Sequence, residues 1–332
     1  MSKNNWLPLI ISLGVLFCIN MLMVSSLAPS TLIKQLISWV IGIILFFIGT
    51  QINPKQIASS KTLIFISSCF FLFLPILLNN ITRGSRRWID LGFFSFQPSE
   101  MVKPWLMLFL VNTDFPLLIL IPIAIIMVQP DLGSAITVFM LLIHIIFYNI
   151  KLIKISALAA IFLIIISPFI WNNLLHDYQR HRVINFINPN SDPLGKGYNV
   201  IQSQIAIGSG GIWGKGYKKG TQGQLLFLPE KHTDFMFAAT SEELGLIGIS
   251  LILGSYLLLI RTLLKIAFSF NHNRQLLLFT LGITFQIWAQ AFINIGMNLG
   301  ILPVTGIPLP FLSVGGSSLM ALMFSLGVIF SS

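Results

Sequence analysis

Ionisable side chains are scarce in this chain. Among its 332 residues, Asp, Glu, Lys and Arg together make up only 9%, whereas hydrophobic residues make up 55%. A soluble domain of this length leaves much of its surface in water and has no room to bury so large an apolar share. The composition therefore excludes an ordinary soluble enzyme and favours an integral membrane protein.

Cysteine and histidine are scarce as well. The two cysteines, Cys18 and Cys69, both lie inside apolar runs, which favours reduced packing residues over a disulfide framework. The five histidines show no spacing typical of metal ligands. No metal site built from protein side chains is therefore expected. No Ser–His–Asp or Cys–His arrangement for nucleophilic catalysis is visible from the sequence either.

Long apolar runs dominate what remains. Runs of about 15 to 20 residues are long enough to cross a bilayer as helices, which satisfy their backbone groups within each span. We predict an all-α, polytopic membrane protein that forms a single domain over residues 1–332, with a large loop, residues 172–233, between the seventh and eighth spans. About ten spans are expected, at residues 6–24, 32–50, 62–79, 98–112, 115–129, 132–149, 155–174, 234–260, 276–296 and 310–330.

The fourth and fifth spans are short. Residues 98–112 would rise about 22 Å as a helix, less than the roughly 30 Å of the hydrocarbon core. The sequence Asn-Thr-Asp-Phe-Pro at residues 112–116 favours a tight turn, so two spans are predicted here. A single continuous span would invert the topology of everything downstream.

Basic residues leave the orientation open. With the N-terminus inside, the short inner loops carry lysines, as the positive-inside rule expects. The outer side nevertheless holds twelve of the 20 basic residues and the inner side eight. Either the topology is inverted, or the outer basic residues lie in loops long enough to escape the rule and bind an anion such as a phosphate-bearing lipid.

One polar stretch, from Gly220 to Gly248, contains the main catalytic candidate. Asp234 follows a basic, Gly-rich loop and stands at the predicted start of the eighth span, with Thr233 as the expected N-cap. Its carboxylate either only complements the helix dipole or, ionised at neutral pH, accepts a proton from a substrate hydroxyl. Lys231 and His232, just before it, are candidates for substrate binding.

Several charged residues fall inside or beside the spans, where such groups are costly and are functional candidates by default. Glu100 and Lys103 are spaced i, i+3, so they share a helix face and are expected to pair, either structurally or as part of a site. Asp131 either caps the sixth span or belongs to the site. Glu242 and Glu243 cannot share a face, so at least one needs a partner inside the bundle.

The second outer loop is rich in arginine. Arg83, Arg86 and Arg87 lie in RGSRRWIDLG, and arginine is well suited to bidentate contact with phosphate, although a solvated basic loop explains the same pattern. The Gly-rich run at residues 207–220 does not match a nucleotide-binding P-loop, because its spacing is one residue too long and no Ser or Thr follows its lysine.

Seven segments together resemble a known family. They are RWIDLGFFSFQPSE, QPDLGSA, HDYQRHRV, DPLGKGYNVIQSQIAIGSGGIWGKG, LPEKHTDFMFA, EELGLIG and GILPVTGIPLPFLSVGGSS, between residues 87 and 318. In content and order they resemble the SEDS family of shape, elongation, division and sporulation proteins. HDYQRHRV and SDPLGKGYN resemble its elongation members more than its division members.

The resemblance implies a ten-helix peptidoglycan glycosyltransferase of the bacterial cytoplasmic (inner) membrane, with its active site on the extracytoplasmic face. Such enzymes polymerise lipid II, a disaccharide-pentapeptide on undecaprenyl pyrophosphate. The implied partners are a class B penicillin-binding protein and other elongation-complex membrane proteins, with no nucleic acid. The family's catalytic acid falls on Asp234, its PSE motif and following basic position on Glu100 and Lys103, and its PDLG acid on Asp131.

A mechanism follows as a hypothesis. Asp234 deprotonates the acceptor 4-hydroxyl, and the resemblance implies inversion at the donor sugar. Because cations compensate the leaving pyrophosphate, no general acid is needed. Lys103, oriented by Glu100, is expected to bind the pyrophosphate together with Arg86 or Arg87. A divalent cation, Mg²⁺ or Mn²⁺, that bridges the pyrophosphate is compatible with this chemistry.

Two other functions remain open from the residues. A lipid II flippase also needs a polar cavity and phosphate-binding residues, but it has no clear need for an acid after a substrate loop. A non-catalytic scaffold for the penicillin-binding protein would not need intramembrane charges. One departure from the family concerns Val314, which stands where the family usually has tyrosine and so lacks a hydroxyl.

Overall fold

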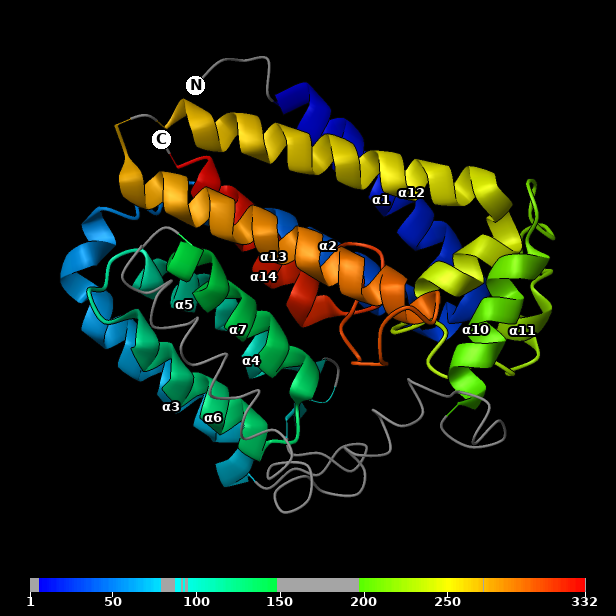
Figure 1. The fold of residues 1–332 in the computed structure, drawn as a ribbon, viewed down its shortest axis with the longest axis horizontal. Coiled ribbons are helices and arrows are strands. Elements are labelled where there is room, and N and C mark those ends of the chain that lie inside the picture. Colours follow the sequence, from blue (N-terminus) through cyan, green and yellow to red (C-terminus); the bar gives the residue numbers. More distant parts are fainter. Residues whose placement is uncertain are drawn as a thin grey trace.

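The computed structural model describes residues 6–78, 87–90, 92, 95–147, 197–270 and 272–331. Most of the residues in these ranges are helical (Figure 1). The α-helices are α1 (Trp6–Leu27), α2 (Leu32–Gly49), α3 (Lys61–Leu78), α4 (Pro98–Met101), α5 (Lys103–Leu110), α6 (Leu120–Val128), α7 (Leu132–Phe147), α10 (Tyr198–Ser209), α11 (Thr221–Gln224), α12 (Met236–Ser269), α13 (Arg274–Asn298) and α14 (Gly316–Ile329). Short 3₁₀ helices cover Pro29–Thr31, Gln56–Ser60 and Pro116–Ile119, and a two-residue hairpin pairs β1 (Ile89–Asp90) with β2 (Ser95–Phe96).

Membrane-spanning character is clear from length and composition. Within the described ranges, five helical segments are long and apolar enough to cross a bilayer. They are α1, α12 and α13, together with α2 and α3, each extended by the short 3₁₀ helix that precedes it. Three shorter apolar segments are formed by α6 with its preceding 3₁₀ helix, by α7 and by α14. The prediction of an all-α polytopic membrane protein is confirmed. The seventh predicted span, residues 155–174, and the first part of the predicted large loop lie outside the described residues, so the number ten stays a prediction.

The fourth and fifth predicted spans are separate segments, as expected. α4 and α5 are divided at Val102, and α5 ends at Leu110 before a turn. Asn112 closes α5, because its Nδ2 donates to Leu108 O at 2.8 Å and to Pro54 O at 3.2 Å. The turn predicted from Asn112 to Pro116 therefore exists, and the chain re-enters the bundle through α6.

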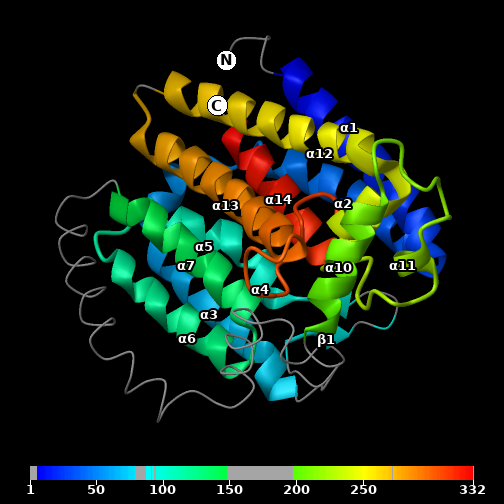
Figure 2. The ribbon, with the colours of Figure 1, turned by 45° about the vertical axis from the view of Figure 1, so that its right-hand side comes forward.

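α14 lies at the centre of the bundle, beside α2 and behind α13 (Figures 1 and 2). Glycines allow this close packing, since a β-carbon at Gly327 would lie 2.0 Å from Phe46 O. At the same end, Trp6 of α1 packs on Phe330, with ring centroids 4.3 Å apart. Almost every residue of α14 is buried, so this helix forms the wall on which the functional site is built.

Three of the loops that are cytoplasmic if the N-terminus is inside meet at one end of the bundle. Asn112, Asp114 and Arg274 line a single cavity of about 400 Å³ there, and Lys61 lies 3.8 Å from Asp114. Because Arg274 starts α13 and Asn298 ends it, this cavity lies at the opposite end of α13 from Asn298.

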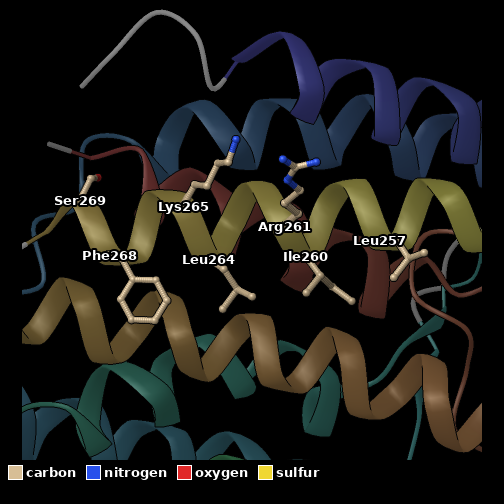
Figure 3. Close-up of a pocket in the computed structure, with 7 residues that line it drawn as sticks. All are labelled: Leu257, Ile260, Arg261, Leu264, Lys265, Phe268 and Ser269. Carbon is tan, nitrogen blue, oxygen red and sulfur yellow. The ribbon is translucent and has the colours of Figure 1, made fainter.

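The last third of α12 carries a basic groove. Arg261 and Lys265 line an open groove of about 680 Å³ together with apolar side chains such as Leu264 and Phe268. Figure 3 shows the two basic side chains on one side of α12 and the apolar ones directed toward α13. Long basic side chains that cover apolar surface while their charged groups reach water are typical of a membrane boundary.

α12 is broken at Gly245, and the break receives a loop. Gly245 has φ 63° and ψ −158°, and Leu246 N donates to Gly211 O at 2.9 Å. A β-carbon at Gly245 would lie 2.3 Å from Gly214 N and 2.6 Å from Ile212 O. Residues 210–216 therefore pack directly on the kink, where only glycine fits without displacing backbone.

Replacing Gly245 by alanine is expected to destabilise the protein by about 3 kcal/mol or more. Alanine is strained at the positive φ of this position, and its β-carbon would overlap the backbone of residues 212 and 214. Gly254→Ala in the same helix is the matched control, since nothing lies within 4 Å of its added β-carbon. That change is expected to be neutral or to stabilise by about 0.5–1 kcal/mol. Thermal unfolding in detergent measures both, and equal effects would contradict the role assigned to the kink.

Candidate functional site

Asp234 lies just before α12, not in its first turn. α12 begins at Met236, and Asp234 belongs to a turn in which its own N–H donates to Glu230 O at 3.1 Å. Thr233 does not cap the helix, because its Oγ1 instead donates to Glu230 O and Oε2 at 3.2 and 3.1 Å. The predicted cap is therefore wrong: the turn at residues 230–235 uses the hydroxyl that would have capped α12.

Two asparagines on α13 hold this turn in place. Nδ2 of Asn294 and Nδ2 of Asn298 donate to Asp234 O at 3.1 and 3.0 Å, and Asn298 Oδ1 accepts from Ala238 N at 3.2 Å. Both asparagines are fully buried, so these bonds are strong constraints on the backbone. They are not among the predicted site residues, although a pair of asparagines at i, i+4 in an apolar helix was a usable signal.

A second strap fixes the same segment from the side of α14. Val314 N donates to His232 O at 2.9 Å, and Ser313 Oγ donates to Thr233 O at 2.5 Å. Residues 232–234 and 313–315 thus run against each other as one wall. These bonds hold the backbone of residues 232–234, and Asp234 lines a cavity beside this wall.

That cavity, the Asp234 cavity, has a volume of about 370 Å³. It brings together residues from segments far apart in the sequence, including four of the predicted site residues: Asp234, Glu100, Asp131 and Arg87. The remaining lining residues are Trp88, Gln97, Gly133, Ser134, Thr137, Glu230, Thr233, Val304, Thr305, Gly306, Ile307, Pro308, Val314, Gly315, Ser317 and Ser318.

Asp131 both caps α7 and forms part of the cavity wall. Its Oδ1 accepts from Ser134 N at 3.2 Å, which is the capping bond, and lies 3.4 Å from an Arg87 guanidinium nitrogen. Its Oδ2 accepts from Gln97 Nε2 at 2.8 Å and from Ser99 Oγ at 3.3 Å. The predicted capping role is confirmed. The extra bonds leave Asp131 fully engaged, so it suits fixing the wall better than accepting a proton.

Glu100 and Lys103 form the predicted ion pair. Lys103 Nζ lies 2.5 Å from Glu100 Oε1, and the two residues are only 1% and 5% exposed, respectively. Ser134 Oγ donates to the same Glu100 oxygen at 3.4 Å. Glu100 lines the Asp234 cavity whereas Lys103 does not. Any influence of Lys103 on a ligand in that cavity therefore passes through Glu100.

The other predicted binding residues are distributed differently. Lys231 is buried and lines neither the Asp234 cavity nor the second cavity described below. Its Nζ donates to Gly223 O at 2.5 Å. Burial lowers the pKa of the Lys231 ammonium, and the Glu243 carboxylate opposes this shift. Its contact with a substrate stays a prediction, and Arg86 lies outside the described residues.

His232 lines a second cavity, here called the Lys34 cavity, of about 540 Å³. Four residues line both cavities: Trp88, Thr233, Val314 and Gly315. The rest of its lining consists of Thr31, Lys34, Gln35, Ser38, Ser95, His232 and Gly316. The two cavities are therefore neighbours across the wall formed by residues 232–234 and 313–315.

Glu242 and Glu243 anchor the loop that precedes the site. Glu242 accepts from Lys215 Nζ at 2.7 Å, from Thr221 Oγ1 at 2.9 Å and from two backbone N–H groups of α11. Glu243 accepts from Ser26 Oγ at 2.7 Å and from Gln224 Nε2 at 2.9 Å. The prediction that at least one of them has a partner inside the bundle is confirmed by the bond from Ser26 of α1 to Glu243, whereas the partners of Glu242 belong to the loop and α11.

Removing the cation from this anchor is expected to loosen the loop. Lys215→Met leaves the fully buried Glu242 carboxylate without its counter-charge and is expected to cost about 2–3 kcal/mol. The cost is less than for a wholly buried pair because Lys215 is partly exposed and the backbone bonds remain. Lys219→Met, on the exposed surface of the same loop, is the control. Proteolysis of the loop in the folded protein should accelerate in the first variant alone.

Metal ligands do not cluster in the part of the chain that the structure describes: no group of three or more His, Cys, Asp or Glu side chains there is suited to a metal ion. The divalent cation stays a prediction.

Known proteins match nearly the whole chain. The sequence profile of the FtsW, RodA and SpoVE family, described as cell cycle proteins, matches residues 4–115 and 113–331. The chain belongs to this family. It is 39% identical over 304 residues to the peptidoglycan glycosyltransferase MrdB of Escherichia coli K12, covering 87% of this chain and 82% of that protein. It is 38% identical over 316 residues to the stage V sporulation protein E of Bacillus subtilis, covering 89% and 85%.

Solved structures agree with this assignment. One chain of a peptidoglycan synthase complex that coordinates polymerization and crosslinking aligns with a TM-score of 0.82 at 31% identity, covering 97% of this chain and 96% of its own. The rod shape determining protein RodA of Thermus thermophilus aligns with a TM-score of 0.68 at 25% identity, covering 97% and 94%. The predictions of the family, of an integral membrane enzyme and of a glycosyltransferase are confirmed.

Proposed function

We propose that this protein is a peptidoglycan glycosyltransferase that polymerises lipid II into glycan strands during cell elongation. The observation that carries the proposal is the Asp234 cavity. Asp234, whose backbone is fixed by hydrogen bonds, lines this cavity together with Glu100, Asp131 and Arg87. It supports the proposal because relatives covering most of the chain are peptidoglycan glycosyltransferases. A sugar hydroxyl in that cavity would meet a base and many hydrogen-bond partners.

In the proposed reaction, Asp234 accepts the proton of the acceptor 4-hydroxyl as the oxygen attacks C1 of the donor sugar. The O4–C1 bond forms on the face opposite the leaving group, which inverts the configuration at C1. The C1–O bond to undecaprenyl pyrophosphate breaks and its electron pair leaves on the pyrophosphate. Cations that compensate this charge replace a general acid.

The other residues of the cavity are given positioning and binding roles. Arg87 presents a guanidinium that is 34% exposed and only weakly paired with Asp131, so it is able to turn toward a phosphate held at the wall beside the Asp234 cavity. Glu100 contacts the acceptor sugar, and Lys103 fixes the Glu100 rotamer from behind. Direct contact of Lys103 with pyrophosphate would need a rearrangement, because the described Lys103 side chain is 2% exposed.

We assign the enzyme to the bacterial inner membrane, with the Asp234 end on the extracytoplasmic face. The basic groups at the other end, around Lys61 and Arg274, support this orientation. A class B penicillin-binding protein is the proposed partner, because one matching structure comes from a complex that coordinates polymerization and crosslinking. Contacts with other elongation proteins are part of the same proposal.

The test is lipid II polymerisation by the purified protein together with its penicillin-binding protein, whose own catalytic serine is replaced. Glycan strands resolved by gel electrophoresis are the expected product. Lipid II that crosses vesicle membranes without being polymerised would favour a flippase. A complex that binds its partner but neither polymerises nor moves lipid II would favour a scaffold.

A further inference from the structure

The two neighbouring cavities differ in charge. We propose that the Lys34 cavity binds the pyrophosphate of the undecaprenyl-linked donor, while the Asp234 cavity binds the acceptor sugar. This inference rests on the proposed function and adds a division of labour between two subsites. It also gives a specific role to Lys34, which is one of the twelve basic residues on the predicted outer side.

Charge separates the two cavities. Four carboxylates line the Asp234 cavity, those of Glu100, Asp131, Glu230 and Asp234, against one cation, Arg87. Lys34 and His232 line the Lys34 cavity, and no acidic residue is among the described residues that line it. A pyrophosphate carries at least two negative charges, so it is repelled from the first cavity and attracted to the second. Sugar hydroxyls, by contrast, are well matched to carboxylate acceptors.

The wall between the cavities places the reacting atoms. Thr233 and Val314 line both cavities, His232 lines one side and Asp234 lines the other. The bonds from Val314 N to His232 O and from Ser313 Oγ to Thr233 O keep this wall fixed. A donor held on the His232 side and an acceptor held on the Asp234 side would meet at this wall. Val314, being small and apolar, leaves room there for the donor C1 and acceptor O4 to approach.

The Lys34 cavity also has a neighbouring surface suited to a polyprenyl chain. Lys34 comes from α2, and the adjacent side chains Ile33, Leu36 and Val40 of that helix are 68%, 47% and 50% exposed. In a membrane protein these exposed apolar residues face lipid. The undecaprenyl chain therefore would leave the cavity along α2 into the bilayer while its pyrophosphate stays beside Lys34.

α14 adds a smaller contribution. Gly315 and Gly316, at its N-terminus, line the Lys34 cavity, and no side chain caps this helix. The partial positive charge of the first helical turn therefore faces the same space as Lys34 and His232. Bond formation between O4 and C1 then releases the electron pair onto a pyrophosphate already held by Lys34, and the proton moves the other way, to Asp234.

The experiment measures binding of undecaprenyl pyrophosphate to the full-length protein in detergent by native mass spectrometry. Lys34→Gln is expected to lower the affinity about tenfold or more, the value of one charge-assisted contact, and Lys34→Arg is expected to restore most of it. Lys265→Gln, the same change in the groove near the end of α12, is the matched control. Asp234→Asn is expected to keep wild-type affinity because it lines the other cavity.

Three ligands separate the headgroup from the chain. Affinity for undecaprenyl pyrophosphate and undecaprenyl phosphate should depend on Lys34, whereas affinity for undecaprenol should not. Wild-type affinity in a folded Lys34→Gln variant, or a loss as large in Asp234→Asn as in Lys34→Gln, would overturn the division into subsites. If the wild type polymerises lipid II in parallel, the proposed function survives that result. Failure of the wild type both to bind the pyrophosphate lipid and to polymerise would count against the function itself.

Discussion

Asp234→Asn is expected to lower the rate of lipid II polymerisation by about a thousandfold or more, within the range lost when a general base is removed. The amide has the size of the carboxylate but does not accept the hydroxyl proton. The surroundings should survive the change, because Asn294 and Asn298 bind the backbone oxygen of residue 234 and not its carboxylate. The loss is therefore expected in kcat, with little change in KM or in thermal stability.

The control is Asp114→Asn, an identical change in a carboxylate that is 90% exposed beside Lys61 at the far end of the bundle. It should polymerise lipid II at the wild-type rate. A folded Asp234→Asn variant that retains a third or more of the wild-type rate would remove Asp234 as the base. Glu100 would then be the next candidate, since the Asp131 carboxylate already accepts from Ser134, Gln97 and Ser99.

The sequence was enough to single out three of the carboxylates that line the Asp234 cavity, whereas Glu230 and Lys34 were not among the predicted site residues. Glu100, Asp131 and Asp234 stand out because a charge is costly in an apolar chain, and the structure brings all three to one cavity. The i, i+3 spacing also predicted the Glu100–Lys103 pair correctly, because helix geometry alone puts those side chains on one face. Span boundaries were mostly within a few residues, as for α2 and α3, where apolar length decides.

Other parts of the site depend on contacts that have no local signature. The hairpin of Ile89 with Phe96 carries Trp88 and Gln97 into the cavities, yet a strand pair of two residues has no readable period. Thr233 does not cap α12, because its hydroxyl donates to Glu230 within the turn that precedes the helix. Lys231, next to the catalytic candidate in sequence, points into the loop because Gly223 O lies there.

The loop ahead of the site shows the same limit. At least one of Glu242 and Glu243 was predicted to need a partner, but the partners of both come from α1, α11 and the glycine-rich segment, up to 217 residues away in sequence. Spacing within α12 indicates only that the two carboxylates point in different directions. Which polar groups meet them depends on how the loop at residues 210–224 folds over the kink at Gly245, and that is a tertiary property.

Lys103→Met is expected to be the most destabilising change in the site, at about 3–5 kcal/mol, because it leaves the Glu100 carboxylate buried without a counter-charge. The double variant Glu100→Gln with Lys103→Met removes both charges and should recover most of that loss, since neutral replacements of a buried pair are often tolerated. Thermal unfolding of the wild type, both single variants and the double variant gives the coupling energy directly.

The activity of the double variant then distinguishes a purely structural role of the Glu100–Lys103 pair from a role of Glu100 in substrate binding. If Glu100 and Lys103 only neutralise each other inside the bundle, restoring stability should also restore lipid II polymerisation. If Glu100 contacts the acceptor sugar, as its place in the wall of the Asp234 cavity suggests, the stable double variant should stay at least tenfold slower, with a raised KM for lipid II. We expect the second result, because Lys103 is buried whereas Glu100 lines the same cavity as Asp234.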